Sequence, residues 1–237
     1  MSFGDRSQHT RVNPMLLGPL ERPALRWLAA HMPAWVRPDL LTAFGFFGTV
    51  VIFVSYILTN HSPWFLWLAS LGLIMNWFGD SLDGTLARYR NIERPKYGFF
   101  VDHIVDALDE VLVFLGLGLS PYIDFKIAAL ALIGYMLMSV LVYVDTIVTG
   151  KFRISYAKLG PTEMRVLIII TNAVIFFAGN PLVNLPWVKW TPTLYDLILA
   201  FGAILMFVGF ILYSYIKISE LAKLEPSERK ARQEQNQ

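Results

Sequence analysis

The 237-residue chain is apolar: 55% of its residues are hydrophobic and 16% are charged, whereas ordinary soluble domains contain about 25% charged residues. This composition excludes an ordinary soluble domain and indicates an integral membrane protein, which at this length we expect to form one domain over residues 1–237. The absence of cysteine excludes disulfide bonds and thiol chemistry. The net charge of +2 by itself says little about partners, and we expect no nucleic-acid partner.

The N-terminal segment, residues 1–37, is predicted to lie at the membrane surface. It lacks the continuous apolar core of a cleavable signal peptide, so we expect none. From residue 19 the sequence PLERPALRWLAAHMPAWVRP interleaves leucine and tryptophan with Glu21, Arg22 and Arg26. Tryptophan beside arginine suits the boundary between lipid and water, so we predict an interfacial amphipathic helix on the cytoplasmic leaflet. A soluble linker is the alternative.

Six stretches of the chain are predicted to cross the membrane, because a spanning helix needs roughly 20 mostly apolar residues. They are residues 40–59, 64–85, 98–119, 127–149, 163–183 and 194–216. The sequence therefore predicts an all-α membrane protein with six transmembrane helices. The third stretch is the least hydrophobic, because it contains Asp102, His103, Asp106, Asp109 and Glu110.

The distribution of lysine and arginine predicts the orientation of these helices. Of the 20 basic residues, 18 fall on one side: in the N-terminal segment, in residues 88–96, in residues 151–165 and beyond residue 216. Lys126 and Lys189 fall on the other side. Basic residues concentrate on the cytoplasmic side of membrane proteins, so both termini and the polar tail, residues 222–237, are predicted to be cytoplasmic.

Four aspartates lie at the predicted cytoplasmic ends of the second and third spans. Asp80 and Asp83 are three residues apart and Asp102 and Asp106 are four apart, so each pair lies on one helix face. Four neighbouring carboxylates would repel one another and take up protons unless cations neutralise them. Oxygen ligands favour Mg²⁺, Mn²⁺ or Ca²⁺ over zinc, and we therefore predict a divalent-cation site rather than loop charges or interhelical ion pairs.

Small residues and an arginine accompany these carboxylates. Gly84 and Ala87 follow Asp83, and Gly98 begins the facing helix, so space is left beside the acids. Arg88, at the helix end, can bind phosphate with its planar guanidinium. Mg²⁺ sites commonly combine a few carboxylates with substrate phosphates, which makes a nucleotide-diphosphate pocket the best interpretation.

The pattern formed by these residues is Asp80-x2-Asp83-Gly84-x2-Ala87-Arg88-x9-Gly98-x3-Asp102-x3-Asp106. It resembles the signature of the CDP-alcohol phosphotransferase family, whose members make phospholipids. The segment RPDLLTAFG at 37–45 is similar to the family's Pro-Asn/Asp-x-x-Thr segment before the first span. The signature covers only residues 80–106, whereas the six-span plan resembles the family over most of the chain.

The resemblance implies a homodimeric enzyme with a cavity open to the cytoplasm and to lipid, in which an alcohol attacks a CDP-alcohol and CMP leaves. It implies two divalent cations, Mg²⁺ or Mn²⁺, held by Asp80, Asp83, Asp102 and Asp106, with Asp106 also the general base. For His103 we expect a packing role or one behind the metal ligands, and it is the next base to test if Asp106 is not the base. It implies donor contacts from Asp39, Thr42, Gly84, Ala87, Arg88 and Gly98. Some relatives place a small hydroxyl residue between the positions of Arg88 and Gly98. This chain reads RNIERPKY there and has no serine or threonine.

The alcohol substrate is left open. The spellings Asp102-His103-x-x-Asp106, Thr149-Gly150 and Gly160-Pro161-x-Glu163 are similar to those of choline and ethanolamine phosphotransferases, which favours CDP-choline or CDP-ethanolamine with diacylglycerol as the acceptor. The alternative is CDP-diacylglycerol with a polar alcohol such as inositol phosphate, glycerol phosphate or serine. Candidate acceptor contacts are Asp145 and Glu163, which would suit an ammonium group, and Arg165, which would suit an anion near a helix N-terminus.

Two other classes of membrane protein are considered. An intramembrane prenyltransferase also uses aspartate-rich helices and Mg²⁺, and the spacing Asn76-x3-Asp80-x2-Asp83 is faintly similar to its motif. A cation transporter would be expected to carry its acids near the middle of the membrane rather than at the cytoplasmic end beside an arginine.

Overall fold

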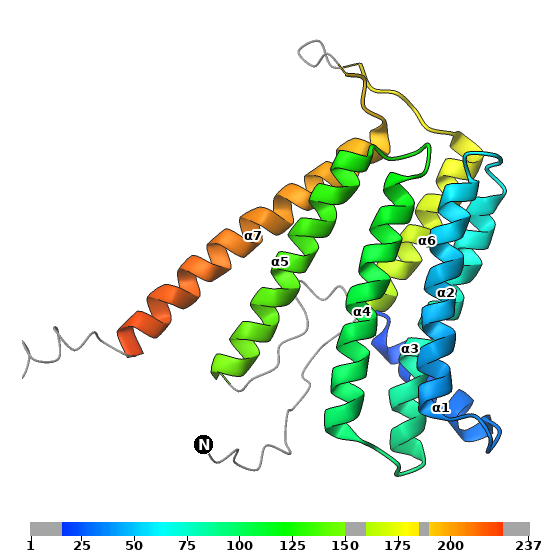
Figure 1. Cartoon of the computed structure of the whole chain (residues 1–237), viewed down its shortest axis with the longest axis vertical. Helices are drawn as coiled ribbons and strands as arrows, with labels where there is room; N and C mark the ends of the chain where they lie inside the picture. Colours follow the sequence, from blue (N-terminus) through cyan, green and yellow to red (C-terminus); the bar gives the residue numbers. More distant parts are fainter. Residues whose placement is uncertain (1–15, 150–159, 185–189, 225–237) are drawn as a thin grey trace, which may run out of the picture.

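The computed structural model describes residues 16–149, 160–184 and 190–224, and this part of the chain is helical apart from its connections and one isolated β-bridge (Figure 1). The helices are α1 (Gly18–His31), α2 (Pro38–Leu58), α3 (Phe65–Tyr89), α4 (Pro95–Gly118), α5 (Phe125–Thr149), α6 (Pro161–Ala178) and α7 (Leu194–Leu224). Helices α2 to α7 coincide in order with the six predicted stretches. The basic residues at 151–158 and most of the predicted tail lie outside the described residues.

Five of the described helices are long and apolar enough to cross a membrane, namely α2, α3, α5, α6 and α7. The chain is therefore an integral membrane protein that crosses the bilayer several times. Helix α4 is as long as these but does not meet the same measure of hydropathy and charge, since its middle carries four acidic residues. Four boundaries differ from prediction by four residues or more. Helix α1 ends at His31 rather than near residue 38, and α6 ends at Ala178 rather than near residue 183. Helix α3 continues to Tyr89 rather than about 85, and α7 continues to Leu224 rather than about 216.

Glycines let α2 and α3 approach each other more closely than larger side chains would allow. A Cβ atom added at Gly48 would lie 2.8 Å from the Gly72 carbonyl oxygen, and one added at Gly79 would collide with the backbone of Gly45 and Leu41. Small residues at such a crossing replace side-chain contacts with backbone contacts, which is a common way of packing helices in membranes. Because Asp80 follows Gly79, this crossing also fixes where the first aspartate lies relative to α2.

Helix α1 packs on the C-terminal half of α3 through an apolar cluster. Leu25 and Ala29 of α1 are buried against Leu82 and Leu86 of α3. The chain that leaves α1 is held by Arg90, whose guanidinium donates hydrogen bonds to backbone carbonyl oxygens of Met32, Pro33 and Val36 at 2.5–2.9 Å. The N-terminal helix is thus part of the fold.

Two carboxylates join α1 to α3 and α6. One Glu21 oxygen accepts hydrogen bonds from Trp77 Nε1 of α3 and from Thr162 Oγ1 of α6, both at 2.7 Å. The two Glu163 oxygens accept backbone N–H groups of Leu17, at 2.8 Å, and Gly160, at 2.9 Å. These bonds satisfy helix-terminal N–H groups of α1 and α6 at once.

Helices α5 and α7 form a pair that leans away from the other spans, as Figure 1 shows. A cavity of about 2340 Å³ lies between the helices and is lined by residues from all seven of them. It reaches the aspartates of α3 and α4 and continues past apolar side chains such as Ile52, Leu73 and Ile175. One cavity therefore offers both a polar and an apolar environment.

The α2–α3 crossing predicts that Gly79→Ala destabilises the protein, because the added methyl group would meet backbone that cannot move aside. We expect the free energy of unfolding to fall by about 1–3 kcal/mol. Gly209→Ala on α7 is the matched control, since a Cβ there meets nothing within 4 Å. The measurement is the thermal unfolding midpoint in detergent; equal midpoints for the two variants would show that the close approach is not needed.

Candidate active site

Three aspartates from two helices meet at one place. Asp80 of α3 and Asp102 and Asp106 of α4 each offer a carboxylate oxygen, and these three oxygens lie within 4.8 Å of one another. All three side chains are partly buried and line the cavity. A set of three carboxylate oxygens at this separation could hold a divalent cation of the Mg²⁺ or Mn²⁺ type.

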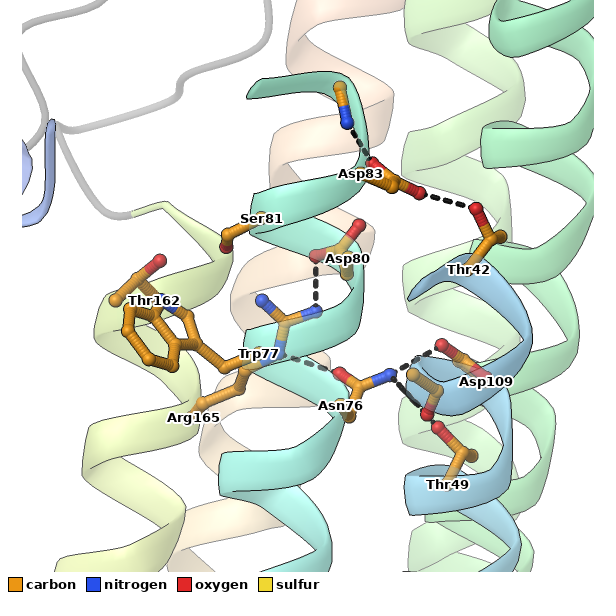
Figure 2. Close-up of polar contacts among 12 residues, drawn as sticks. Thr42, Thr49, Asn76, Trp77, Asp80, Ser81, Asp83, Asp109, Thr162 and Arg165 are labelled. Atoms are coloured by element: carbon orange, nitrogen blue, oxygen red, sulfur yellow. Dashed lines mark hydrogen bonds and ion pairs between the residues drawn. The ribbon is translucent and has the colours of Figure 1, made fainter. Parts of the chain in front are cut away.

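The fourth predicted ligand, Asp83, lies one helical turn from Asp80 and outside this group of three oxygens. Its Oδ2 accepts a 2.6 Å hydrogen bond from Thr42 Oγ1 of α2, and its Oδ1 accepts one from the Gly84 backbone N–H (Figure 2). Both Thr42 and Asp83 line the cavity. The structure thus places a predicted metal ligand and a predicted donor contact in direct contact with each other.

Arg165 links α6 to the aspartates. Its Nη2 donates to Asp80 Oδ2 at 2.6 Å, and its Nε donates to Asn76 Oδ1 at 2.8 Å (Figure 2). The Asn76 Nδ2 in turn donates to Asp109 Oδ2 at 2.7 Å and to Thr49 Oγ1 at 3.0 Å. One network of hydrogen bonds therefore connects α2, α3, α4 and α6 behind the carboxylates.

Asn76 was not among the predicted site residues. The available signal was an amide side chain inside an apolar span, four residues before Asp80, because a buried amide needs partners for both its N–H groups and its carbonyl oxygen. Asn76 is 5% exposed and Asp109 is 9% exposed, so both polar groups need partners inside the protein, and each is a partner of the other.

The glycines predicted to contact the donor leave open space. A Cβ atom at Gly98 would meet nothing within 4 Å, and one at Gly84 would meet only the guanidinium of Arg88, which is the end of a flexible side chain. Ala87 and Arg88 also line the cavity. These positions contrast with Gly79, where the neighbour is backbone, so their small size serves the cavity rather than helix packing.

The remaining predicted donor contact, Asp39, forms an exposed ion pair. Its carboxylate accepts two hydrogen bonds from Arg94 Nη2, at 2.5 and 2.7 Å, and the guanidinium of Arg94 lies 3.9 Å from the ring centre of Tyr97. The hydrogen bond to Asp39 raises the pKa of Arg94, so this group stays charged at any physiological pH. The pair joins the start of α2 to the start of α4 beside the cavity.

Of the three residues predicted to contact the acceptor, Arg165 lines the cavity, whereas Asp145 and Glu163 are not among the described residues that do. Asp145 accepts a 2.8 Å hydrogen bond from Tyr213 and lies 3.5 Å from Lys217 Nζ, which ties α5 to α7. Glu163 accepts the backbone N–H groups described above. These contacts favour structural roles for both carboxylates.

Comparison with known proteins decides which family this site belongs to. The sequence model described as CDP-alcohol phosphatidyltransferase matches residues 35–215, a stretch that contains all four predicted metal ligands. The chain belongs to the CDP-alcohol phosphatidyltransferase family. Membership confirms the resemblance read from the signature and decides against the prenyltransferase and transporter alternatives.

The individual relatives of this family member share between 26% and 39% of their residues with it over the matched stretches. Cholinephosphotransferase 1 of Danio rerio is 30% identical over 165 residues, 65% of this chain and 41% of the relative. Cholinephosphotransferase 1 of Homo sapiens is 26% identical over 220 residues, 89% of this chain and 52% of the relative. An uncharacterized protein of Aquifex aeolicus (strain VF5) is 39% identical over 83 residues, 35% of this chain and 39% of the relative. The chain thus spans about half the length of these cholinephosphotransferases or less.

The buried network predicts that Asn76→Ala destabilises the protein. The variant would leave Asp109 and Arg165 Nε without the amide that joins them, and an unsatisfied buried group costs about 1–3 kcal/mol. Asn60→Ala is the control, because the amide of Asn60 is exposed and bonds only backbone carbonyl oxygens. The thermal unfolding midpoint should fall clearly further for Asn76→Ala; a midpoint unchanged from that of the unmutated protein would show that the network contributes no stability.

Proposed function

We propose that this chain is a metal-dependent CDP-alcohol phosphotransferase of phospholipid synthesis. It transfers the phospho-alcohol group of a CDP-alcohol to an acceptor hydroxyl and releases CMP. The observation that carries the proposal is the meeting of Asp80, Asp102 and Asp106 within 4.8 Å at a cavity with polar and apolar walls, in a member of this family. Such a cavity suits a reaction that joins a lipid to a water-soluble group.

The cation-binding residues in this proposal are Asp80, Asp83, Asp102 and Asp106, which would hold two divalent cations, Mg²⁺ or Mn²⁺. Bound cations would neutralise the diphosphate and the charge that develops in the transition state. Arg165, hydrogen-bonded to Asp80, reduces the repulsion among the carboxylates and keeps Asp80 turned toward α6. The open space at Gly84 and Gly98, together with Ala87 and Arg88, would receive the donor's nucleotide and phosphates. Asp39 and Thr42 border the same space from α2.

The chemistry assigned to the chain's own residues is positioning and proton transfer. The acceptor oxygen forms a bond to the phosphorus that carries the alcohol, and the bond from that phosphorus to the oxygen retained by CMP breaks. Asp106 accepts the proton of the attacking hydroxyl. His103 is the alternative base, but its Nδ1 lies 2.8 Å from the Phe99 carbonyl oxygen of its own helix.

The proposed placement in the membrane has the aspartates at the cytoplasmic face. In it the whole chain is one membrane domain, α4 is a sixth span and α1 lies in the interface. The acidic residues of α4 face the cavity rather than lipid, which would let a helix of this composition sit within a bundle. The concentration of 18 of 20 basic residues on one side supports cytoplasmic termini, and the family resemblance supports a homodimer.

For the substrate we favour CDP-choline or CDP-ethanolamine as the donor and diacylglycerol as the acceptor. Support comes from the relatives named Cholinephosphotransferase 1 and from the local spellings at 102–106 and 160–163. The alternative, CDP-diacylglycerol with inositol phosphate, glycerol phosphate or serine, uses the same carboxylates and the same apolar cavity.

The experiment that tests the function is release of CMP by the purified protein. CDP-choline, CDP-ethanolamine and CDP-diacylglycerol are supplied separately with Mg²⁺ and candidate acceptors, and the lipid products are identified by mass spectrometry. We expect CMP and a phospholipid from an aminoalcohol donor, and neither product from Asp102→Asn. Release of no CMP from any donor would contradict the proposal.

The proposed role of the base predicts that Asp106→Asn separates binding from chemistry. Asparagine keeps an oxygen ligand but cannot take up the hydroxyl proton, and loss of a general base typically costs about 10²–10⁴ in rate. We expect donor affinity, measured by calorimetry, to stay within several-fold while single-turnover CMP release collapses. Asp102→Asn should lose both. If Asp106→Asn loses donor binding as fully as Asp102→Asn, Asp106 is a metal ligand only; normal turnover would move the base to His103.

A further inference from the structure

A second, much smaller cavity lies beside the clustered aspartates. Its walls come from α2, α3 and α4, and α2 packs against both of the other helices. Its volume is about 10 Å³. One buried water molecule needs roughly 10–15 Å³, so this space suits a single small ligand. The polar part of the lining consists of Thr42, Asn76, Asp80, Asp102, Asp106 and Asp109.

One carboxylate oxygen in this wall lacks a partner. Asp109 is 9% exposed, and its Oδ2 accepts a hydrogen bond from Asn76. Its Oδ1 is buried and has no hydrogen-bond partner among the described residues. A buried carboxylate oxygen without a partner is costly, and an ordered water molecule is one way to satisfy it. Because Asp109 lines the small cavity, a molecule held there lies within reach of this oxygen.

The network around Asn76 fixes which oxygen of Asp109 is left over. Arg165 Nε donates to Asn76 Oδ1 at 2.8 Å, and the other end of the same amide, Nδ2, donates to Asp109 Oδ2 at 2.7 Å (Figure 2). Arginine has donors and no acceptor, so the amide of Asn76 cannot turn round without losing its bond to Arg165. Arg165 thus orients Asn76, and Asn76 holds one oxygen of Asp109. The second oxygen remains available to the cavity.

Asp109 does not belong to the group of carboxylates that could bind one cation directly. Among the described residues, the oxygens within 4.8 Å of one another come from Asp80, Asp102 and Asp106. Mg²⁺ usually keeps several water ligands when a protein binds it. Groups that accept hydrogen bonds from the ligands of a metal orient those ligands and strengthen binding. One water molecule can therefore connect a cation at the three aspartates with Asp109.

We propose that the small cavity binds one water molecule, which is a ligand of the cation at the three clustered aspartates and donates a hydrogen bond to Asp109 Oδ1. The proposal rests on the cation site of the proposed function and adds Asp109 to that site as a positioning residue. The carboxylate fixes the direction of the water and makes it a stronger ligand. Arg165 then acts on the cation site in two ways, directly at Asp80 and through Asn76 at Asp109.

The test compares the Mn²⁺ affinity of the purified protein with that of Asp109→Asn, measured by electron paramagnetic resonance. Asn76 donates at this position, so the new side chain turns its oxygen to Asn76 and its NH₂ group to the cavity. The hydrogen bond that supports the fold is kept, but the cavity gains N–H donors where the water needs an acceptor. Loss of such an outer partner typically weakens metal binding by about 10- to 100-fold, and we expect a loss in this range.

Glu110→Gln is the matched control. Glu110 is the next residue on α4 and lines the large cavity, but it is not part of the lining of the small one. The control therefore removes the same charge close to the aspartates without changing the small cavity, and we expect its Mn²⁺ affinity to change far less. Equal losses in the two variants would show that Asp109 acts through its charge alone and would overturn the water site, as would unchanged affinity in Asp109→Asn.

A measurement on the unmutated protein keeps the proposal testable if a variant does not fold. Pulsed electron paramagnetic resonance in water labelled with a magnetic oxygen isotope detects water ligands of bound Mn²⁺. With a CDP-alcohol bound as well, we expect at least one water ligand to remain, whereas none would overturn the water site and leave the cation site standing. Absence of saturable Mn²⁺ binding to the unmutated protein contradicts the metal-dependent function itself, and the water site falls with it.

Discussion

Repulsion among carboxylates held close together is the constraint on which this structure depends. Asp80, Asp102 and Asp106 present oxygens within 4.8 Å of one another at the end of apolar helices, where water screens charge poorly. The chain offsets part of this repulsion with Arg165, whose guanidinium lies 2.6 Å from Asp80. One arginine cannot balance three carboxylates, so the site retains negative charge that suits cations.

The rest of the fold holds these charges in place. Backbone contact between α2 and α3 at Gly79 sets the position of Asp80. Glu21 and Glu163 fix the start of α6 against α1 and α3, and Arg165 lies within the first two turns of α6. The position of the arginine at the aspartates therefore depends on α1, a helix that contributes no carboxylate to the cluster of three.

Features that depend on local spacing in the chain, namely the helices and the helix faces that carry the acids, could be predicted from the sequence. The intervals within 80–83 and 102–106 place acids on helix faces, and the apolar stretches gave all six long helices in order. It could not predict contacts whose partners are remote in the chain, such as Glu163 with Leu17, which are 146 residues apart. Asn76 was missed as a site residue for the same reason, since its partners Asp109 and Arg165 come from two other helices.

The most direct test of the central claim is the number of Mn²⁺ ions bound per chain, measured by electron paramagnetic resonance on the purified protein with a CDP-alcohol present. If Arg165 and the α2–α3 crossing hold the carboxylates in place, we expect saturable binding of two Mn²⁺ ions. Asp102→Asn should abolish that binding while the protein stays folded. Absence of saturable Mn²⁺ binding, or binding that Asp102→Asn leaves unchanged, would contradict the account.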